Sequence, residues 1–219
     1  MKRLFLASSG LEYIKVFVKK DPSDLRMLFI PTAGNLDNDA WWIKKDQDVL
    51  GKMGFQITEF DIAEETYENL ENALNNTDIV YVAGGNTFYL LQQLQDTGFD
   101  KLLTKYVEDG VLYAGASAGS IIAGLDIEPV SVLDEPKKVE GLATTKALGW
   151  VRAVPVPHYD MTARTKVIDG IKKKYEGKFE IVLLTDDEAM VVEGDDWKLV
   201  ESKRSALERK WFDDYHDSM

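Results

Sequence analysis

The sequence predicts a single α/β domain of three layers, in which helices flank both faces of a mainly parallel sheet. Its 219 residues, 45% of them hydrophobic, suit one compact domain better than two small ones. Short apolar runs alternate with amphipathic helical patterns, which is typical of βαβ units around a parallel sheet. No internal repeat or low-complexity linker interrupts this alternation. We therefore expect one domain over residues 1–200 and a charged, helical tail over residues 201–219.

The expected strands are short runs rich in aliphatic, β-branched and aromatic residues. The run at 79–82 is apolar throughout, as a strand buried on both faces requires. The sequence Pro-Thr-Ala-Gly at 31–34 is a loop signal that ends the second run. In chain order, the expected strands are 4–7, 27–30, 55–62, 79–82, 111–114, 150–156, 179–184, 190–192 and 197–200.

The expected helices are marked by apolar residues that recur at helical spacing. Leu70, Ala73 and Leu74, for example, fall at positions i, i+3 and i+4 and define one helix face. Gly54 and Gly110 follow periodic segments and act as stop signals. Segment 130–145 has a looser pattern, which predicts either a surface excursion or a hairpin. In chain order, helices are expected at about 37–53, around 70–74, at 88–94, at 102–107, through 121–124 and at 167–175.

The numbers of cysteine and histidine residues limit which catalytic groups and metal sites the protein can contain. The chain has no cysteine, which excludes disulfides, a thiol nucleophile and cysteine-ligated zinc. It has two histidines, His158 and His216, so a multi-histidine metal site is not expected. Carboxylate sites for Mg²⁺ or Ca²⁺ stay open. Catalysis that depends on histidine must use one of these two residues.

Net charge and hydropathy indicate which classes of partner and which cellular location to expect. The formal net charge of −12 argues against a nucleic-acid partner, because phosphate binding needs a concentrated basic surface. No apolar stretch reaches the length needed to span a bilayer, so no membrane partner is expected. The first apolar run, at 4–7, is too short for a signal peptide, which favours a cytoplasmic location.

The sharpest local motif is Gly-Ala-Ser-Ala-Gly at 115–119, which fits the pattern G-x-S-x-G. A predicted strand precedes it and a helical pattern follows it. That context is typical of a nucleophile elbow, in which a sharp turn lifts the hydroxyl of Ser117 above the sheet edge. The first N–H groups of the helix then favour negative charge that develops at the reacting centre. An ordinary glycine-rich turn between a strand and a helix is the alternative interpretation.

A second glycine-rich turn, Gly-Gly-Asn-Thr at 84–87, also lies between a predicted strand and a predicted helix. Two glycines allow the backbone to approach a ligand closely. In the catalytic interpretation, the N–H groups of Gly85 and Ala118 together bind an oxyanion. A phosphate-binding turn is the rival interpretation. Asn86 is expected either to contact the substrate or to cap the following helix.

The third motif is Pro-Val-Pro-His-Tyr at 155–159, directly after a predicted strand. Its two prolines stiffen the approach to His158. A serine needs a base to become nucleophilic at neutral pH, and histidine is the usual one. His216 is a weaker candidate because it lies close to the end of the sequence. We therefore expect His158 to activate Ser117.

These three segments together resemble the peptidase E (aspartyl dipeptidase) family, which also includes the cyanophycinases. The resemblance rests on residues 83–88, 115–119 and 157–159 in that order, and it extends over about residues 1–200. It implies a class I glutamine-amidotransferase-like α/β fold and Ser-His-acid chemistry. It also implies that the glycine loop builds the oxyanion hole, and that no metal or organic cofactor takes part.

The family resemblance places the acid after the histidine, ahead of the last hairpin, and matching that segment selects Asp186. Family members often carry Glu there, although a shorter carboxylate can still orient an imidazole. Asp187 and Glu188 are the near alternatives. An acid between serine and histidine, Asp134 or Glu135, would instead give the chain order of ordinary α/β-hydrolases.

The same resemblance predicts a small peptide substrate with an N-terminal aspartyl residue. Arg164 resembles the arginine that binds this side chain in the family, and a guanidinium suits a carboxylate. A solvent-facing helix arginine is the alternative. Other interpretations keep the fold but change the activity: another acidic amide or ester, such as a cyanophycin-like or isoaspartyl peptide, or a binding module without catalysis.

The tail carries three aromatic residues, Trp211, Phe212 and Tyr215, among many charges. Two arrangements stay open for them. They dock either onto the domain or onto a second copy of the chain, and the second arrangement would give a homodimer.

Overall fold

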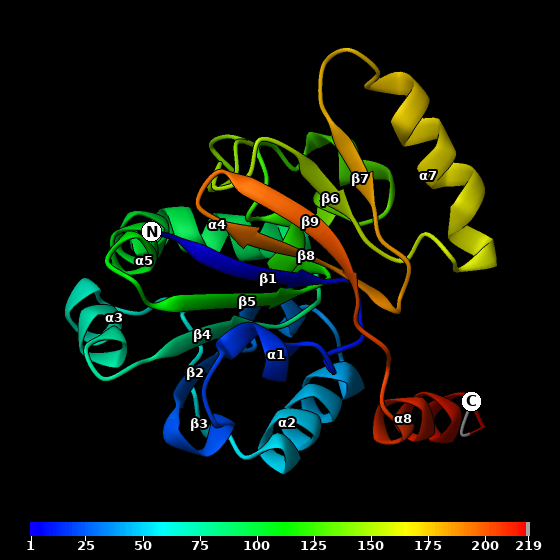
Figure 1. Cartoon of the computed structure of the whole chain (residues 1–219). Helices are drawn as coiled ribbons and strands as arrows, with labels where there is room; N and C mark the ends of the chain where they lie inside the picture. Colours follow the sequence, from blue (N-terminus) through cyan, green and yellow to red (C-terminus); the bar gives the residue numbers. More distant parts are fainter. Residues whose placement is uncertain (218–219) are drawn as a thin grey trace.

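The computed structural model describes residues 1–217, with side chains described through residue 213. Its centre is a seven-stranded sheet in the order β3-β2-β4-β5-β1-β8-β9 (Figure 1). The first five of these strands run parallel, and β8 and β9 run antiparallel at one edge. The strands are β1 Arg3–Ala7, β2 Arg26–Ile30, β3 Gln56–Glu59, β4 Ile79–Val82, β5 Leu112–Ala116, β8 Glu188–Glu193 and β9 Asp196–Glu201.

A second, smaller sheet consists of β6 (Val154–Val156) and β7 (Ile181–Leu183), which pair in parallel. These two strands do not join the main sheet. The helices are α1 Ile14–Val18, α2 Trp41–Met53, α3 Tyr67–Leu74, α4 Thr87–Thr97, α5 Phe99–Glu108, α6 Ala118–Ile121, α7 Thr162–Lys174 and α8 Ala206–Asp217, with 3₁₀ turns at Pro22–Asp24, Thr32–Gly34, Glu128–Val132 and Pro136–Lys138.

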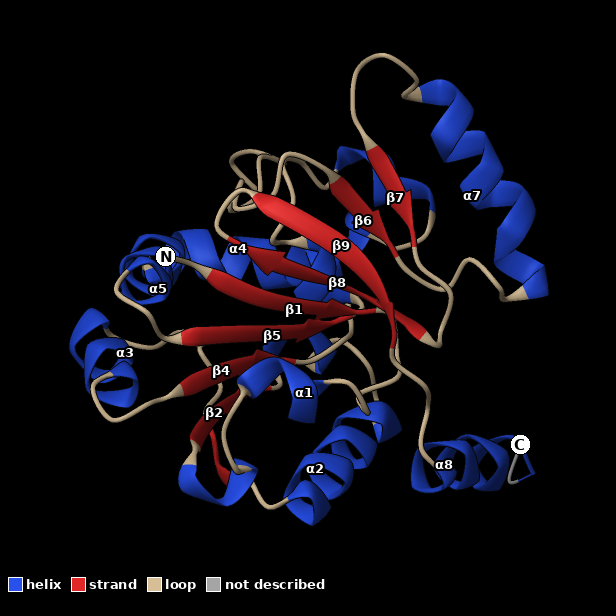
Figure 2. Cartoon of the chain, viewed as in Figure 1, coloured by secondary structure: helices blue, strands red, loops and turns tan. Residues whose placement is uncertain are grey.

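Helices cover both faces of the main sheet (Figure 2). In β2, Leu28 and Ile30 join the core beneath α3, α4 and α5, whereas Met27 and Phe29 join the core beneath α1 and α2. This division follows from the period of two along a strand, because every strand residue points to one face or the other. The predicted architecture, a mainly parallel sheet between two helical layers, is confirmed.

The short helix α6 differs from the sequence expectation. Segment 121–124 was expected to be the body of a helix, but α6 ends at Ile121. The chain then turns, and the N–H of Leu125 donates to the carbonyl of Ala153 at 3.3 Å. A Cβ on Gly124 would lie 2.7 Å from the same carbonyl, so glycine permits this close approach.

Two further segments bear on the sequence predictions: one matches one of two predicted arrangements, and the other was not predicted. Segment 130–145 forms a surface excursion with 3₁₀ turns and no hairpin. Helix α1, at Ile14–Val18, has no counterpart among the predicted helices, because its five residues are too short to show a period.

Residues 206–217 form helix α8, which packs beside α2 (Figure 1). A capping box begins this helix. The N–H of Glu208 donates to Ser205 Oγ at 3.2 Å, and the N–H of Ser205 donates to Glu208 Oε2 at 2.6 Å. Leu207 packs against the core beneath α1 and α2. In the described part of the chain, the tail therefore packs against its own domain.

No helix within residues 1–217 combines the length and the apolar character that a bilayer crossing requires. The cytoplasmic location stays a prediction.

Candidate active site

Three neighbouring parallel strands, β4, β5 and β1, end at the same edge of the sheet. Ser8 directly follows β1, Gly84 and Gly85 follow β4, and Ser117 follows β5. In open α/β sheets, ligands bind beyond the carboxyl ends of the strands, where loops from adjacent strands converge. The sheet topology therefore brings two of the three sequence motifs together.

The turn at Ser117 has the geometry of a nucleophile elbow. Ser117 adopts φ 50° and ψ −111°, a backbone conformation that costs a non-glycine residue on the order of 1–3 kcal/mol. Its N–H donates to the carbonyl of Ala7 at 3.1 Å, which ties the turn to β1. A Cβ on Gly115 would lie 2.4 Å from the carbonyl oxygen of Gly119, and a Cβ on Gly119 would lie 2.1 Å from that of Val82. The motif thus needs glycine at both ends for steric reasons.

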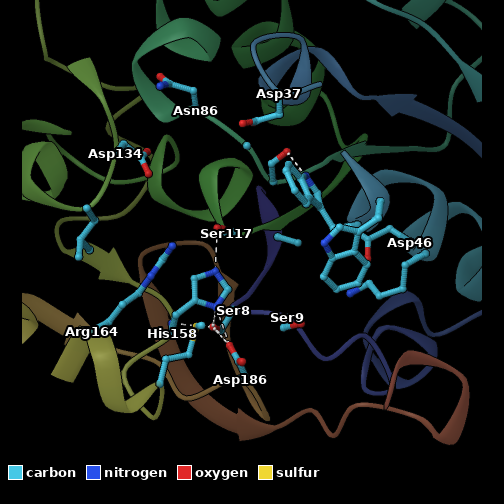
Figure 3. Close-up of a pocket in the computed structure, with 18 of the residues that line it drawn as sticks. Ser8, Ser9, Asp37, Asp46, Asn86, Ser117, Asp134, His158, Arg164 and Asp186 are labelled. Atoms are coloured by element: carbon cyan, nitrogen blue, oxygen red, sulfur yellow. Dashed lines mark hydrogen bonds and ion pairs between the residues drawn. The ribbon is translucent and has the colours of Figure 1, made fainter. Parts of the chain in front are cut away.

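Ser117, His158 and Asp186 form a continuous chain of hydrogen bonds (Figure 3). His158 Nε2 lies 3.0 Å from Ser117 Oγ, and His158 Nδ1 lies 2.6 Å from Asp186 Oδ1. His158 follows β6 and adopts a left-handed backbone with φ 64°. Asp186 lies in the loop between β7 and β8. Three residues that the sequence singled out separately are therefore in contact.

None of the four alternative acids forms a hydrogen bond with His158. Asp187 accepts hydrogen bonds from Arg204, and Glu188 accepts from the backbone and hydroxyl of Thr185. Asp134 accepts from the N–H of Thr87 at 2.9 Å, and Glu135 is exposed and paired with Lys138. Asp186 is thus the carboxylate that contacts the imidazole in this structure.

Asp186 is 6% exposed, yet its environment favours the ionised form. Burial is the largest single influence and by itself would raise the pKa of Asp186. The hydrogen bond and charge of His158, the hydroxyl of Ser8 and the charge of Arg204 together outweigh burial and leave the pKa below its ordinary value. A buried carboxylate that stays ionised can hold an imidazole in one orientation.

Sequence reasoning missed Ser8, which links two of these residues. Its hydroxyl donates to Asp186 Oδ1 at 3.0 Å and accepts the backbone N–H of His158 at 2.9 Å. Ser8 is 1% exposed. Its position directly after the first strand, at the edge where loops converge, was the signal that could have identified it.

Arg204 and Asp160 also support the acid and were not predicted. Arg204 Nη1 lies 3.3 Å from Asp186 Oδ2, and the rest of the guanidinium engages Asp187. Asp160 Oδ1 accepts the backbone N–H of Asp186 at 2.8 Å. Asp186 is therefore held at both carboxylate oxygens and at its backbone N–H.

The glycine loop after β4 lies against the elbow. A Cβ on Gly84 would lie 3.1 Å from Ser117 Cβ. Gly85 has φ 145°, and a Cβ there would lie 2.1 Å from the carbonyl oxygen of Ala33, so no other residue fits without rearrangement. Among the described residues, no hydrogen bond uses the N–H of Gly85 or of Ala118, the first residue of α6. Two unused donors beside the serine agree with the predicted oxyanion role, which stays a prediction.

Asn86 caps helix α4. Its Oδ1 accepts the N–H groups of Phe88 and Tyr89, both at 3.0 Å, and its Nδ2 donates to the carbonyl of Glu135 at 3.3 Å. Asn86 lines the cavity beside Ser117, but both ends of its amide are engaged within the chain. Of the two roles expected for Asn86, the structure shows the helix cap, whereas contact with the substrate stays a prediction.

A cavity of about 460 Å³ opens in front of Ser117 and His158. Arg164, in the first turn of α7, is partly buried and lines it, and the ion pairs of the described residues include none with Arg164. Figure 3 shows this side chain pointing into the cavity, on the same side as Asp134. The other three lining cations each pair with a carboxylate: Lys45 with Asp46 at 2.9 Å, Lys138 with Glu135 at 2.9 Å and Arg204 with Asp186 at 3.3 Å.

Asp134 is the other charged group near Arg164. Burial, the largest influence, raises the pKa of Asp134 above its ordinary value, and hydrogen bonds from Thr87 and the charges of Arg164 and His158 oppose that rise. This end of the cavity therefore offers one cation and one carboxyl group side by side. No group of three or more His, Cys, Asp or Glu side chains suited to a metal ion occurs within the described part of the chain. The side chain of His216 lies outside the described residues.

Comparisons with known proteins find peptidases among the relatives of this chain. An uncharacterised peptidase from Listeria monocytogenes is 34% identical over 197 residues, which are 89% of this chain and 96% of that protein. Peptidase E from Shigella flexneri is 36% identical over 96 residues, 44% of this chain and 40% of that protein. A crystal structure described as a candidate peptidase E from L. monocytogenes superimposes with a TM-score of 0.86 at 30% identity, covering 93% of this chain and all of that one.

A family profile gives the remaining comparison. The profile of peptidase family S51 matches residues 5–200, a stretch that contains the glycine loop, the elbow and the segment of His158. This agrees with the resemblance to peptidase E that the three motifs carry. The chain belongs to peptidase family S51.

Proposed function

We propose that this family member is a serine peptidase in which Ser117 is the nucleophile, His158 the general base and Asp186 the residue that orients His158. The observation that carries the proposal is the continuous chain of hydrogen bonds from Ser117 Oγ through the imidazole to Asp186, with distances of 3.0 and 2.6 Å. Such a chain matches the roles of nucleophile, base and orienting acid that define serine hydrolase chemistry.

The geometry supports a two-step reaction. With Nδ1–H donating to Asp186, Nε2 accepts the hydroxyl proton while Ser117 Oγ attacks the scissile carbonyl carbon. The negative charge on the carbonyl oxygen is stabilised by the N–H groups of Gly85 and Ala118. His158 then passes its proton to the leaving amine, and the C–N bond breaks to give an acyl-enzyme. Water attacks the acyl group, its proton goes to His158 and then to Ser117, and the acid is released.

The cavity favours a small substrate with an N-terminal aspartyl residue. Such a residue carries a carboxylate and an ammonium group close together. Arg164 offers a guanidinium without an ion-pair partner among the described residues, and Asp134 offers a carboxyl group beside it. A guanidinium binds a carboxylate through paired hydrogen bonds. A second substrate class, an isoaspartyl or cyanophycin-like amide, presents a free α-carboxylate in place of the side-chain one and is the main competitor.

Two measurements test this proposal. A fluorophosphonate probe should label Ser117, as located by mass spectrometry of the digested protein, and Ser117→Ala should abolish labelling. Ser9, another serine that lines the cavity, supplies the matched control, and Ser9→Ala should label normally. Absence of labelling in folded protein would indicate a binding module rather than a hydrolase.

The second measurement compares substrates. Asp-X dipeptides should be hydrolysed with a higher kcat/KM than the corresponding Ala-X and isoaspartyl-X dipeptides. Labelling of Ser117 combined with a preference for isoaspartyl peptides would support the serine mechanism and contradict the aspartyl dipeptidase assignment.

A further inference from the structure

The cavity has an aromatic wall formed by two segments that are distant in sequence. Trp41 and Trp42 come from the start of α2, and Phe212 comes from α8. The ring of Trp41 meets those of Trp42 and Phe212 edge to face, with centroids 6.2 Å apart in both pairs. Trp42 Nε1 donates to the carbonyl of Gly84 at 3.0 Å, so the wall is joined directly to the glycine loop beside Ser117.

Helix α8 is held in place by buried polar contacts. Glu208 is 1% exposed, and its Oε1 accepts the N–H of Leu11 at 3.2 Å while its Oε2 completes the capping box with Ser205. Arg204, just before the helix, is joined to the loop of Asp186 and Asp187. Phe212 is therefore positioned by the same chain segment that supports the acid.

This wall includes a segment beyond the region that the family profile matches. The match ends at residue 200, and both Arg204 and α8 follow it. The motifs that define the family thus account for the hydrogen-bonded chain and the glycine loop, but not for Phe212. A specificity that depends on Phe212 belongs to this chain and to relatives that share its tail.

The aromatic wall and Arg164 lie on opposite sides of the reacting groups. Figure 3 shows Arg164 of α7 on one side of Ser117 and His158, and Asp46 of α2 on the other. A dipeptide spans Ser117 with its scissile carbonyl, so its two residues occupy the two ends of the cavity. When the aspartyl residue binds Arg164, the leaving residue extends toward α2 and α8.

We propose that Trp41, Trp42 and Phe212 form the subsite for the side chain of the leaving amino acid, and that this subsite selects large apolar or aromatic residues. The assignment rests on the proposed aspartyl dipeptidase function, because Arg164 sets the direction of the substrate. Apolar side chains gain from leaving water against such a wall, and aromatic ones also gain edge-to-face contacts.

Charge at this end argues against an acidic leaving residue. Lys45 is the cation beside the wall, and it is already paired with Asp46 at 2.9 Å. The buried carboxylates of Glu208 and Asp186 are also close enough to interact with Lys45. Three carboxylates, those of Asp46, Glu208 and Asp186, therefore act on the single ammonium group of Lys45, so Asp-Glu should be a poorer substrate than Asp-Phe.

The test compares kcat/KM for Asp-Phe and Asp-Gly in the full-length protein. The wild type should prefer Asp-Phe, and Phe212→Ala should lower kcat/KM for Asp-Phe by about 5- to 10-fold while Asp-Gly changes little. Phe212→Leu, which keeps an apolar side chain, should recover part of the loss. Tyr67→Ala is the matched control, because Tyr67 is an exposed aromatic residue on α3 that does not line the cavity. Equal rates for the two dipeptides in the wild type, or an unchanged ratio in Phe212→Ala, would overturn the subsite.

A second readout separates this subsite from the proposed function. Phenylalaninamide should protect Ser117 from the fluorophosphonate probe better than glycinamide does, and Phe212→Ala should remove the difference. If Asp-X dipeptides are not hydrolysed but this selective protection is present, the aspartyl assignment fails and the aromatic subsite stands. If they are hydrolysed and protection is equal for both amides, the subsite fails and the function stands.

Discussion

The hydroxyl of Ser8 joins Asp186 to His158, and we expect its removal to affect both stability and activity. In Ser8→Ala, Asp186 loses a hydrogen bond of 3.0 Å, and the backbone N–H of His158 loses its acceptor at 2.9 Å. A hydrogen bond to a charged group contributes about 1.5–3 kcal/mol, and a buried donor left without a partner costs about 1–3 kcal/mol. Allowing for partial relaxation, we expect a loss of about 2–4 kcal/mol in the free energy of unfolding.

That loss corresponds to a fall in Tm of roughly 5–15 °C for a chain of this length, measurable by calorimetry or circular dichroism. Because the hydroxyl also fixes the direction of His158, kcat should fall by about 10- to 100-fold. Ser9→Ala provides the control, because Ser9 is the neighbouring serine and lines the same cavity. A Ser8→Ala protein with the wild-type Tm and kcat would refute the role assigned to this contact.

Three further predictions address the acid, the substrate and pH. Asp186→Asn should lower kcat by about 10⁴-fold because an amide cannot stabilise the imidazolium, whereas Asp187→Asn should cost far less; similar losses at both positions would refute the assignment. Arg164→Met should lower kcat/KM for Asp-X dipeptides by about 10- to 100-fold and leave Ala-X dipeptides nearly unchanged, as initial rates on both series will show. The pKa of Asp186 is held below its ordinary value. The ionised carboxylate therefore contributes its full stabilisation at pH values above the ordinary pKa, and this stabilisation is lost as pH falls through the lower, folded-state pKa. Acid unfolding followed by fluorescence should therefore be less steep in Asp186→Asn, and an unchanged slope would contradict the direction of the shift.

The centre of the sheet was largely predictable because strands β1, β2, β4 and β5 are buried on both faces. Runs such as 79–82 are apolar throughout, and β4 has the expected bounds Ile79–Val82. Helix α6, which the sequence analysis extended beyond its observed end, ends where a distant contact begins. Helix α6 stops at Ile121 because the backbone next approaches Ala153, about thirty residues away, and no local pattern encodes that approach.

The same distinction applies to the site. Ser117, Gly85 and His158 each lie in a local motif whose glycines or prolines reflect backbone geometry. The sequence alone therefore identifies them as candidate site residues. Ser8 contacts a backbone 150 residues away and a carboxylate 178 residues away, and its own neighbours show no special pattern. Arg204 is one of four Lys and Arg residues in a charged tail. Residues that act by supporting another side chain carry no signal in a single sequence until the fold brings them together.

The C-terminal segment couples the stability of the fold to the geometry of the cavity. Arg204 binds the loop of Asp186, Glu208 binds the N–H of Leu11 near the end of β1, and Phe212 faces the cavity from the same helix. Displacement of residues 204–212 would therefore remove Phe212 from the cavity and Arg204 from Asp186. Because the cation helps to keep Asp186 ionised, such a displacement would raise the pKa of Asp186 as well as open the site. The C-terminal segment, which follows the region that the family profile matches, thus lines the cavity and contributes a cation that favours the ionised form of Asp186.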